Sequence, residues 1–493
     1  MTTVEALARE GAEKRVARVR AMDLQFREMQ RDRLLSVLRQ NEGTEFGRSH
    51  GFASIRTVAD FQRAIPISAA ADYEAAWNRI AEGASNVLFS DPVHAFGLSS
   101  GTTGEAKLIP LAKGLLRGLK HAIGYATCCA MARTGNWSLL RGYALQMAAP
   151  TCVRRLLGSI PVGYITGIIG ASRSYPFHNI GIPPIDVLDR MDWAEKYRIV
   201  EERYSDHDVR MIFGVPNYIH GLLRHILAGR RRPLWPDLSL VVTSGTSLAP
   251  HREAFAQVFP KAEFREMYLA TEAAVGFQPA PEPGLMAVAE DVFLEFVPEE
   301  AYGAAPGAPG TTAPPPAPPR FLLGEAEPGV AYVPIVTTPS GLYAYSLGDV
   351  VRFLERDPPR FEVVGRLGNV INLATEKLEA GQAERAVREA DLRCAAFLVC
   401  PLAPPEIGHE WVVEFRGVPP ADAAERIDLA LRRINPLYRH LREGGGLLAA
   451  PHVTAVAADA FARALLRRPG QGKILAIYND RAIRDELVAE GPA

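Results

Sequence analysis

The chain has 493 residues, a formal net charge of −1, 48% hydrophobic residues and 23% charged residues, a composition typical of globular proteins with sizeable cores. The balanced charge gives no electrostatic case for binding nucleic acid or an anionic membrane. No apolar run approaches the roughly 20 residues of a membrane span, and the charged N-terminal segment is no signal peptide. We therefore expect a cytoplasmic protein whose five cysteines, which fall in no metal-binding spacing, are reduced.

The first part of the chain is expected to be helical. Apolar positions repeat at helical spacing from about Val4 to Gln40. Thr57 and Asp60 then precede a short apolar run, which predicts short helices joined by turns. Residues 111–132 predict one long helix with an apolar face that belongs to the core, made of Leu115, Leu116, Leu119, Ile123 and Ala126.

Before the long helix lies the segment Ser99–Lys107, which reads Ser-Ser-Gly-Thr-Thr-Gly-Glu-Ala-Lys and directly follows an apolar run. Glycines let backbone N–H groups turn inward, hydroxyl groups add donors, and the lysine adds a positive charge, a combination that suits a chain of phosphates. The spacing is not that of a P-loop, because Lys107 follows Glu105-Ala106 rather than glycine. We interpret the segment as a phosphate-binding loop, with an ordinary polar turn as the alternative.

Three apolar segments further along the chain are predicted to be strands, at residues 209–213, 238–242 and 263–268. Each runs into a polar loop, and helices are predicted to follow at Asn217, as the capping residue, and at Pro250. Repeated strand, loop and helix units predict a mostly parallel sheet with ligands at the carboxyl ends of its strands. The cluster Asp206-His207-Asp208 is interpreted as a polar turn.

The segment 301–320 is low in complexity and rich in proline, so we expect a flexible surface loop. The sequence on both sides of it is β-rich, which indicates one sheet interrupted by an insertion. A new series of predicted helices and strands begins after Arg366. We therefore predict an N-terminal domain at 1–366 and a smaller C-terminal domain at 367–493.

Several side chains suit parts of a nucleotide. Tyr268 offers a flat ring for a purine, with a core tyrosine as the alternative, while Thr271 offers a hydroxyl group for a phosphate. Glu272 offers a carboxylate for Mg²⁺. Asp349, after the turn at Leu347-Gly348, is suited to accept hydrogen bonds from two ribose hydroxyls. Two cations that can meet phosphate follow, Arg366 and Lys377.

In this order, these segments resemble the adenylate-forming acyl/aryl ligase superfamily and, more closely, the auxin-conjugating (Gretchen Hagen) acyl-acid amido synthetases. The likeness covers nearly the whole chain. Besides the phosphate loop, it rests on Asn41–Gly47, Phe61–Ile67, Ile80–Gly83, Gly341-Leu342-Tyr343 and Asn435-Pro436-Leu437-Tyr438-Arg439. The N-terminal matches are not shared by acyl-CoA ligases in general.

The resemblance implies an α/β fold with a large N-terminal domain, which has parallel sheets and a β-barrel-like part, and a smaller, mobile C-terminal α+β domain. It implies an ATP-dependent ligase that adenylates a small carboxylic acid and passes the acyl group to an amino acid or another amine. An acyl-CoA or acyl-carrier thioester ligase is the alternative, and a degenerate nucleotide-binding scaffold a further one. No obligate protein partner is expected, and neither the acid nor the amine is identified.

The resemblance also implies roles for individual residues. The phosphates of ATP are expected to contact Ser99, Ser100, Thr102, Thr103 and, at the pyrophosphate end, Lys107. Adenine is expected to stack on Tyr268 in a pocket lined by Ser244, Gly245 and Thr246. The α-phosphate, Mg²⁺ and the ribose are expected to contact Thr271, Glu272 and Asp349, respectively. The lysine that serves adenylation is either Lys473, in Gly470-Gln471-Gly472-Lys473, or Lys377. The Tyr268–Glu272 turn lacks the glycine usual in the family.

Overall fold

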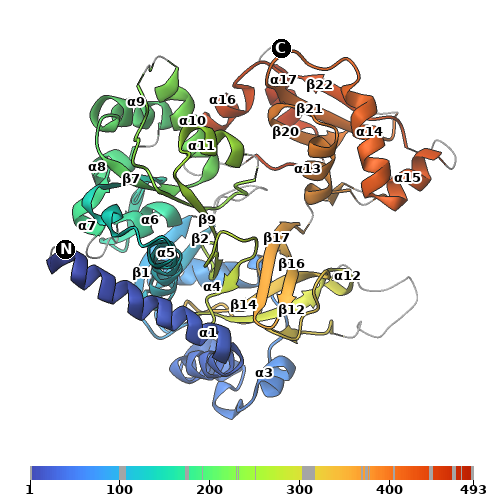
Figure 1. Ribbon diagram of the computed structural model, residues 1–493. Coiled ribbons are helices and arrows are strands. Elements are labelled where there is room, and N and C mark those ends of the chain that lie inside the picture. The colour runs from blue at the N-terminus through green and yellow to red at the C-terminus, as the bar shows by residue number, and fades with distance from the viewer. Residues whose placement is uncertain are drawn as a thin grey trace, which may run out of the picture. The chain divides into compact units, whose positions relative to one another are not determined.

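The computed structural model describes residues 3–98, 107–171, 177–190, 192–228, 230, 232–249, 251–302, 317–367, 370–371, 373, 376, 378–403, 406–443, 448–468, 474–478 and 480–489. The chain divides into two compact units (Figure 1). Unit 1 comprises Met1–Leu347 and Val351–Val363, and unit 2 comprises Gly348–Val350 and Val364–Ala493. The boundary predicted from the sequence falls at the end of strand β17 (Pro359–Arg366).

Unit 1 begins with the helices α1 (Thr3–Asn41), α2 (Glu45–Ser49), α3 (Val58–Ala64) and α4 (Ala70–Ala81). Thr57 caps α3 through a reciprocal pair of hydrogen bonds with Asp60, as the sequence pattern predicts. Helix α1 lies against the long helix α5 (Lys113–Thr134). Helix α5 starts later than predicted, because Leu111 and Ala112 complete strand β2 (Leu108–Ala112).

A four-stranded sheet carries the segment that leads into the predicted phosphate loop. Its order is β2, β1 (Val93–Leu98), β5 (Ile160–Tyr164) and β4 (Arg154–Leu156). Strands β1 and β2 are antiparallel, and Leu98 pairs with Leu108. The intervening residues, most of which lie outside the described part, therefore connect two paired strands.

The second sheet of unit 1 has seven strands. Its order is β11 (Met286–Ala287), β10 (Ala274–Phe277), β9 (Glu263–Leu269), β8 (Leu240–Ser244), β7 (Val209–Gly214), β3 (Tyr143–Met147) and β6 (Gly181–Ile182). Strands β9, β8, β7, β3 and β6 pair in parallel, as predicted for the first three. The helices α6 (Ile165–Ala171), α7 (Phe177–Ile180), α8 (Ile185–Leu188), α9 (Trp193–Tyr204), α10 (Pro216–Leu227) and α11 (Arg252–Val258) connect them.

One predicted cap is wrong. Helix α10 begins at Pro216, and Val215 is its N-cap residue, so Asn217 lies inside the helix. Proline has a fixed φ and no N–H group, and it therefore suits the first helical position, where an N–H group has no partner within the helix.

The third sheet of unit 1 contains both flanks of the proline-rich insertion. Its order is β13 (Phe321–Leu322), β12 (Phe293–Pro298), β14 (Ala331–Thr337), β16 (Asp349–Arg356) and β17, and β15 (Tyr345–Ser346) pairs with β14. Helix α12 (Glu299–Tyr302) follows β12. Residues 303–316 lie outside the described part, so their predicted flexibility stays a prediction.

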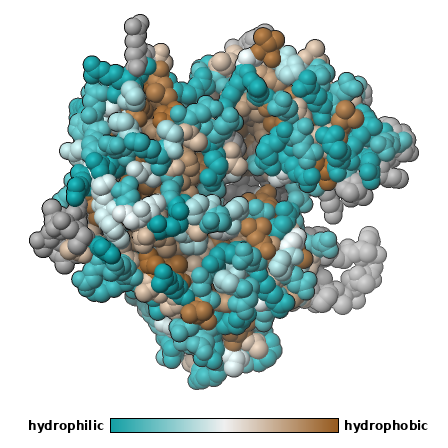
Figure 2. Space-filling model, viewed as in Figure 1, coloured by the Kyte–Doolittle hydropathy of each residue, from teal (hydrophilic) through white to brown (hydrophobic). Residues whose placement is uncertain are grey.

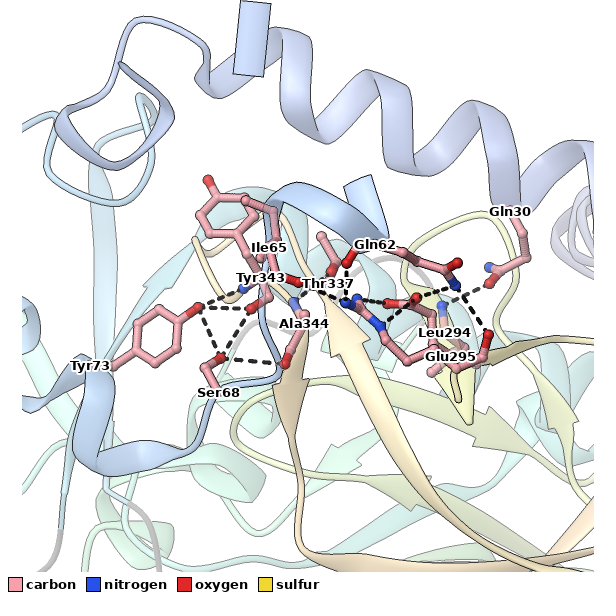
Figure 3. A network of polar contacts seen from close by, with 11 residues as sticks. Gln30, Gln62, Ile65, Ser68, Tyr73, Leu294, Glu295, Thr337, Tyr343 and Ala344 are labelled. Carbon is pink, nitrogen blue, oxygen red and sulfur yellow. Dashed lines mark hydrogen bonds and ion pairs between the residues drawn. The ribbon is translucent and has the colours of Figure 1, made fainter. Parts of the chain in front are cut away.

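The C-terminal end of the insertion is anchored, contrary to the prediction of flexibility over all of 301–320. Arg320 Nε donates to Glu295 Oε1 at 2.9 Å, and its guanidinium also donates to the carbonyl oxygen of Ile65 at 2.7 Å. Figure 3 shows the labelled partners Gln62, Ile65 and Glu295 around this contact. Since Glu295 is fully buried, the guanidinium neutralises a carboxylate that has no access to solvent.

Unit 2 is built on the sheet β20 (Cys394–Pro401), β21 (His409–Phe415) and β22 (His452–Ala455). The hairpin of β18 (Val370–Ile371) and β19 (Leu378–Glu379) precedes it. Helices α13 (Ala380–Glu389), α14 (Ala423–Ile434) and α15 (Pro436–Glu443) lie in one core with Trp411 and Val413. Helices α16 (Ala460–Leu466) and α17 (Ala482–Val488) share the other core with Val412.

Within the described part of the chain, no helix is both long and apolar enough to cross a membrane. The visible surface is mostly hydrophilic, with hydrophobic side chains in small scattered groups (Figure 2). The five cysteines all lie in the described part of the chain, and none is in a disulfide bond.

Candidate nucleotide and acyl-transfer site

The parallel pairing of β8 and β9 brings two predicted site segments to one edge of the sheet. Ser244, the last residue of β8, pairs with Met267, so the loop after β8 and the end of β9 lie at the same carboxyl edge. Tyr268 follows Met267 directly. The structure therefore places the predicted adenine-pocket residues on adjacent strand ends, where parallel sheets bind ligands.

The loop after β8 has the features of a binding loop. Gly245 has a φ of +89°, a conformation that favours glycine. The N–H group of Leu248 donates to Glu266 Oε1 at 2.9 Å, which ties the end of the loop to β9. The hydroxyl oxygen of Thr246 is buried and has no hydrogen-bond partner among the described residues. A buried hydroxyl without a partner is costly, and a bound ligand would satisfy it.

The segment after Tyr268 forms a tight turn without the glycine usual in the family. The N–H group of Ala270 donates to the carbonyl oxygen of Ala273 at 2.9 Å. Neither Leu269 nor Ala270 has a positive φ, so this turn does not need glycine. Tyr268 is 8% exposed and packs in the main core cluster of unit 1. Its ring therefore has a packing role in the core as the alternative to the predicted stacking on adenine.

Thr271 lies against the strand that leads into the predicted phosphate loop. A Cβ atom added to Gly97 would lie 2.4 Å from Thr271 Cγ2 and 3.3 Å from Leu111 Cδ1. Only glycine allows this approach of β1 to Thr271. Because Leu98 is the last residue of β1, the residue before it, Gly97, lies against Thr271 close to the start of the predicted loop. The sequence analysis missed Gly97, where close packing against Thr271 leaves no room for a side chain.

Lys107, the last residue of the predicted loop, forms an ion pair with Glu74 of α4. The Nζ atom lies 3.7 Å from Glu74 Oε1, and the two side chains are 37% and 54% exposed. A long ion pair between exposed groups contributes little to stability. The contact of Lys107 with pyrophosphate stays a prediction. The carboxylate of Glu74 competes with pyrophosphate for the positive charge of Lys107.

A polar network holds the chain that leads to Asp349 (Figure 3). Tyr73 Oη donates to the carbonyl oxygen of Tyr343 at 3.0 Å and accepts from its N–H group at 2.9 Å. Burial raises the pKa of Tyr73 to about 12, which keeps this donor protonated. Ser68 donates to the same carbonyl oxygen at 3.1 Å, and Ala344 N donates to Thr337 Oγ1 at 3.0 Å. The backbone of Tyr343 is thus fixed to the side chains of Ser68 and Tyr73.

Asp349 itself starts strand β16 after Gly348, which has a φ of +73°. The carbonyl oxygen of Gly348 accepts from Leu367 N at 2.6 Å. Residues 348–350 belong to unit 2, so Asp349 is described with that unit and its predicted ribose contact stays a prediction. Arg366 ends β17. The remaining candidates lie outside the described residues: Ser99, Ser100, Thr102, Thr103, Lys377 and Lys473.

The residues at this edge fit a magnesium nucleotide. The hydroxyl of Thr246, which has no hydrogen-bond partner among the described residues, is a donor for such a ligand, and the partly exposed Glu272 offers a carboxylate oxygen that suits Mg²⁺. Sequence reasoning also missed the buried side chains around Glu376 in unit 2. The motif Asn435–Arg439 was the feature of the sequence that could have pointed to these side chains.

Comparisons with known proteins agree on a family. Residues 15–200 match the model of the GH3 family N-terminal domain, and residues 285–366 match that of the GH3 family central domain, together more than half of the chain. The jasmonoyl-L-amino acid synthetase GH3.3 of Oryza sativa subsp. japonica is 28% identical over 205 residues. That match covers 41% of this chain and 39% of the rice protein.

A longer match is to the indole-3-acetic acid-amido synthetase GH3.8 of Oryza sativa subsp. indica, 25% identical over 72% of this chain and 68% of that protein. In structure, the chain resembles the GH3.15 acyl acid amido synthetase, with a TM-score of 0.77 and 17% identity over 96% of this chain and 95% of that one. A 2-hydroxyisobutyryl-CoA ligase in its postadenylation state gives a TM-score of 0.56 and 14% identity over 93% and 91% of the two chains. These structures share the fold.

Proposed function

Because the chain belongs to the GH3 family, we propose that it is an ATP-dependent acyl-acid amido synthetase. It adenylates a carboxylic acid and transfers the acyl group to the amine of an amino acid or a related amine. The relatives named as amido synthetases support this reaction class. The observation that supports the proposal is the contact of Gly97 with Thr271, because Gly97 lies in the strand before the predicted phosphate loop and Thr271 follows β9, whose end pairs with the end of β8.

In the first half-reaction, a carboxylate oxygen of the acid attacks the α-phosphorus of ATP, and the bond to pyrophosphate breaks. The acid is a poor electrophile as a carboxylate, and the product is a reactive mixed anhydride. The hydroxyl of Thr271 donates to the α-phosphate, and the loop with Gly245 and Thr246 holds the adenine. Asp349 accepts from the ribose hydroxyls. These residues act by orienting the two reactants and by neutralising charge on phosphate.

We propose that Glu272 holds Mg²⁺, which supplies positive charge to the phosphate oxygens when bound. Lys107, Lys377 and Lys473 are the cations available for the pyrophosphate and for the charge that develops in either half-reaction. In the second half-reaction, the amine nitrogen attacks the acyl carbon, the bond to AMP breaks, and the nitrogen loses a proton as the amide forms.

The alternative is a thioester ligase, in which the thiol of coenzyme A or of an acyl carrier replaces the amine. The chain shares its fold with a CoA ligase, which supports this alternative. The matches to GH3 domain models favour amide formation. A cytoplasmic location belongs to the same proposal, and the five free cysteines support it.

The test is AMP release from ATP and Mg²⁺ with a panel of aryl, indolyl and fatty acids, each supplied alone, with mixed amino acids, or with coenzyme A. We expect AMP to rise with amino acids, and the product mass to identify both substrates. A rise only with coenzyme A would move the protein to the thioester ligases. An absence of AMP and of pyrophosphate exchange with every acid would contradict adenylation.

A further inference from the structure

Ala344 has a backbone conformation that residues with a side chain rarely adopt. Its φ is +48°, in the left-handed region that favours glycine. The residue is fully buried, so solvent does not hold it there. A strained conformation of this kind persists only where the surrounding structure fixes it, and such conformations cluster at functional sites. Asp349, the proposed ribose acceptor, follows five positions later in the chain.

Hydrogen bonds on both sides of Ala344 fix this conformation (Figure 3). Its N–H group donates to Thr337 Oγ1 at 3.0 Å, and its carbonyl oxygen accepts from Ser68 N at 3.0 Å. The hydroxyl oxygen of Ser68 lies 3.3 Å from the same carbonyl oxygen. Thr337 is fully buried at the end of β14, and Ser68 precedes α4. Two separate segments of the chain therefore hold the two polar groups of one residue.

The attachment continues in the next residues of the chain. The N–H group of Ser346 donates to the carbonyl oxygen of Ser68 at 2.8 Å. The N–H group of Leu347 donates to the carbonyl oxygen of Pro334, in β14, at 3.4 Å. The chain is therefore fixed as far as Leu347, two positions before Asp349.

A left-handed residue sends the chain in a different direction from an extended one. Without the contacts of Thr337 and Ser68, Ala344 would favour a negative φ, and the residues after it would follow another course. No step of the proposed reaction uses Thr337 or Ser68. The consequence of their contacts is the course of the chain that carries Asp349.

We propose that Thr337 and Ser68 are positioning residues, which hold Ala344 in its left-handed conformation and thereby place Asp349 for the ribose of ATP. This inference rests on the proposed function, because the ribose contact of Asp349 is part of that function. Thr337 and Ser68 act through the backbone of Ala344 and not by touching the nucleotide.

Thr127 in α5 offers a matched control for Thr337. It is 1% exposed, and its hydroxyl group donates to the carbonyl oxygen of Ile123 in the same helix at 2.8 Å. Thr127→Val therefore removes an equally buried hydroxyl group from unit 1 and leaves Ala344 untouched. Asp391, with a φ of +49°, is the corresponding control for a glycine substitution, because it lies in unit 2.

The experiment titrates the full chain with ATP and Mg²⁺ in a calorimeter, a measurement that needs no turnover. We expect Thr337→Val to raise the Kd for ATP by about tenfold, the equivalent of one lost hydrogen bond. Thr337→Ser keeps the acceptor for Ala344 N and should restore the affinity. Thr127→Val should leave the Kd unchanged. Should Thr337→Val fail to fold, Ser68→Ala replaces it in each comparison, with Ser68→Thr as the restoring variant.

Ala344→Gly gives the sharpest comparison, because glycine adopts a positive φ without the steric cost. Added to Thr337→Val, it should recover most of the affinity for ATP. Asp391→Gly in the same background should leave the Kd as it is. In the Asp349→Ala background, Thr337→Val should raise the Kd no further, because both changes act on the same contact.

Three results would each overturn the proposal. They are a wild-type Kd for Thr337→Val, no recovery when Ala344→Gly is added to it, and additive losses when it is combined with Asp349→Ala. Hydrogen exchange of a peptide covering residues 340–347 should be faster in Thr337→Val and unchanged in Thr127→Val, and a wild-type rate in Thr337→Val would overturn the anchoring. A wild-type protein that adenylates no acid would contradict the proposed function alone, because ATP binding and hydrogen exchange still decide on Ala344.

Discussion

In unit 1, the predicted nucleotide-binding residues follow strands β8 and β9, whose parallel pairing alone puts both loops at one edge of the sheet. In unit 2, Glu376 is held by His409 and Asn435, which lie 33 and 59 positions away in the chain. The loops after β8 and β9 are positioned by backbone topology, whereas Glu376 is positioned by side chains. Topology tolerates the loss of any one side chain, so we expect substitutions in the loops after β8 and β9 to remove chemistry, and substitutions of His409 and Asn435 to remove the anchoring of Glu376.

The largest expected effect is at Glu272. Glu272→Ala should lower pyrophosphate exchange by about 100- to 1,000-fold, because it removes the proposed Mg²⁺ ligand next to the reacting phosphate. The measurement is the exchange rate against Mg²⁺ concentration. Since the turn is closed by the backbone bond from Ala270 to Ala273, thermal stability should be nearly unchanged. A wild-type rate and Mg²⁺ dependence would remove Glu272 from the site.

Asp349→Ala is expected to raise the KM for ATP by about 10- to 100-fold, since it removes the proposed acceptor of hydrogen bonds from two ribose hydroxyls. The kcat at saturating ATP should fall less, because the reacting groups stay in place. Initial rates over a range of ATP concentrations measure both constants. An unchanged KM would disprove the ribose assignment.

Gly97→Ala tests whether β1 and Thr271 need their close contact. The new methyl group would lie 2.4 Å from Thr271 Cγ2, and such overpacking costs about 1–3 kcal/mol. We expect adenylation to fall about tenfold, as the strand shifts away from Thr271. Adding Thr271→Ser, which keeps the hydroxyl group and removes Cγ2, should restore most of the rate. A double variant as slow as Gly97→Ala would show that the contact is not what matters.

The smallest effect concerns Lys196, whose Nζ donates to the carbonyl oxygen of Ala148, just after β3, at 2.9 Å. Burial lowers the pKa of Lys196 from 10.5 to about 7. Between these values the unfolded chain holds a proton that the folded chain lacks, so the free energy of unfolding rises with pH, by at most about 1.4 kcal/mol per pH unit. Below pH 7 both states are protonated, and the slope vanishes.

Urea unfolding of the wild type and of Lys196→Met at pH 7, 8 and 9 measures this difference. The variant lacks the titrating amine, and its stability relative to the wild type should fall as the pH rises. Parallel pH profiles for the two proteins would mean that the folded chain keeps Lys196 charged.

Helices and strands were predictable where the hydrophobic pattern of the sequence agrees with the topology of the fold. The strands at residues 209–213, 238–242 and 263–268 follow from apolar runs that end in polar loops, and they pair in parallel as expected. Strand β2 was missed because a short apolar run next to a helix has no periodicity of its own. The cap at Asn217 was wrong because Pro216 sets the first turn.

The site was predictable only in part, for a physical reason. Residues on strand-end loops are brought together by the sheet, so Ser244–Thr246 and Tyr268–Glu272 could be grouped from sequence. The contact of Gly97 with Thr271 depends on the packing of two sheets, and the bond from His409 to Glu376 depends on the register of β21. Neither contact leaves a local pattern in the sequence. Arg320, at the end of the proline-rich segment, was the one charge that signalled an anchor.

The most direct test of adenylation is an isotope measurement. An acid labelled with ¹⁸O in both carboxylate oxygens is incubated with ATP, Mg²⁺, an accepted amine and the wild-type protein, and the products are analysed by mass. Transfer through an acyl-adenylate puts one ¹⁸O atom into AMP and leaves the other in the amide carbonyl. Finding the label in inorganic phosphate, together with ADP, would show an acyl phosphate intermediate and contradict the proposed function.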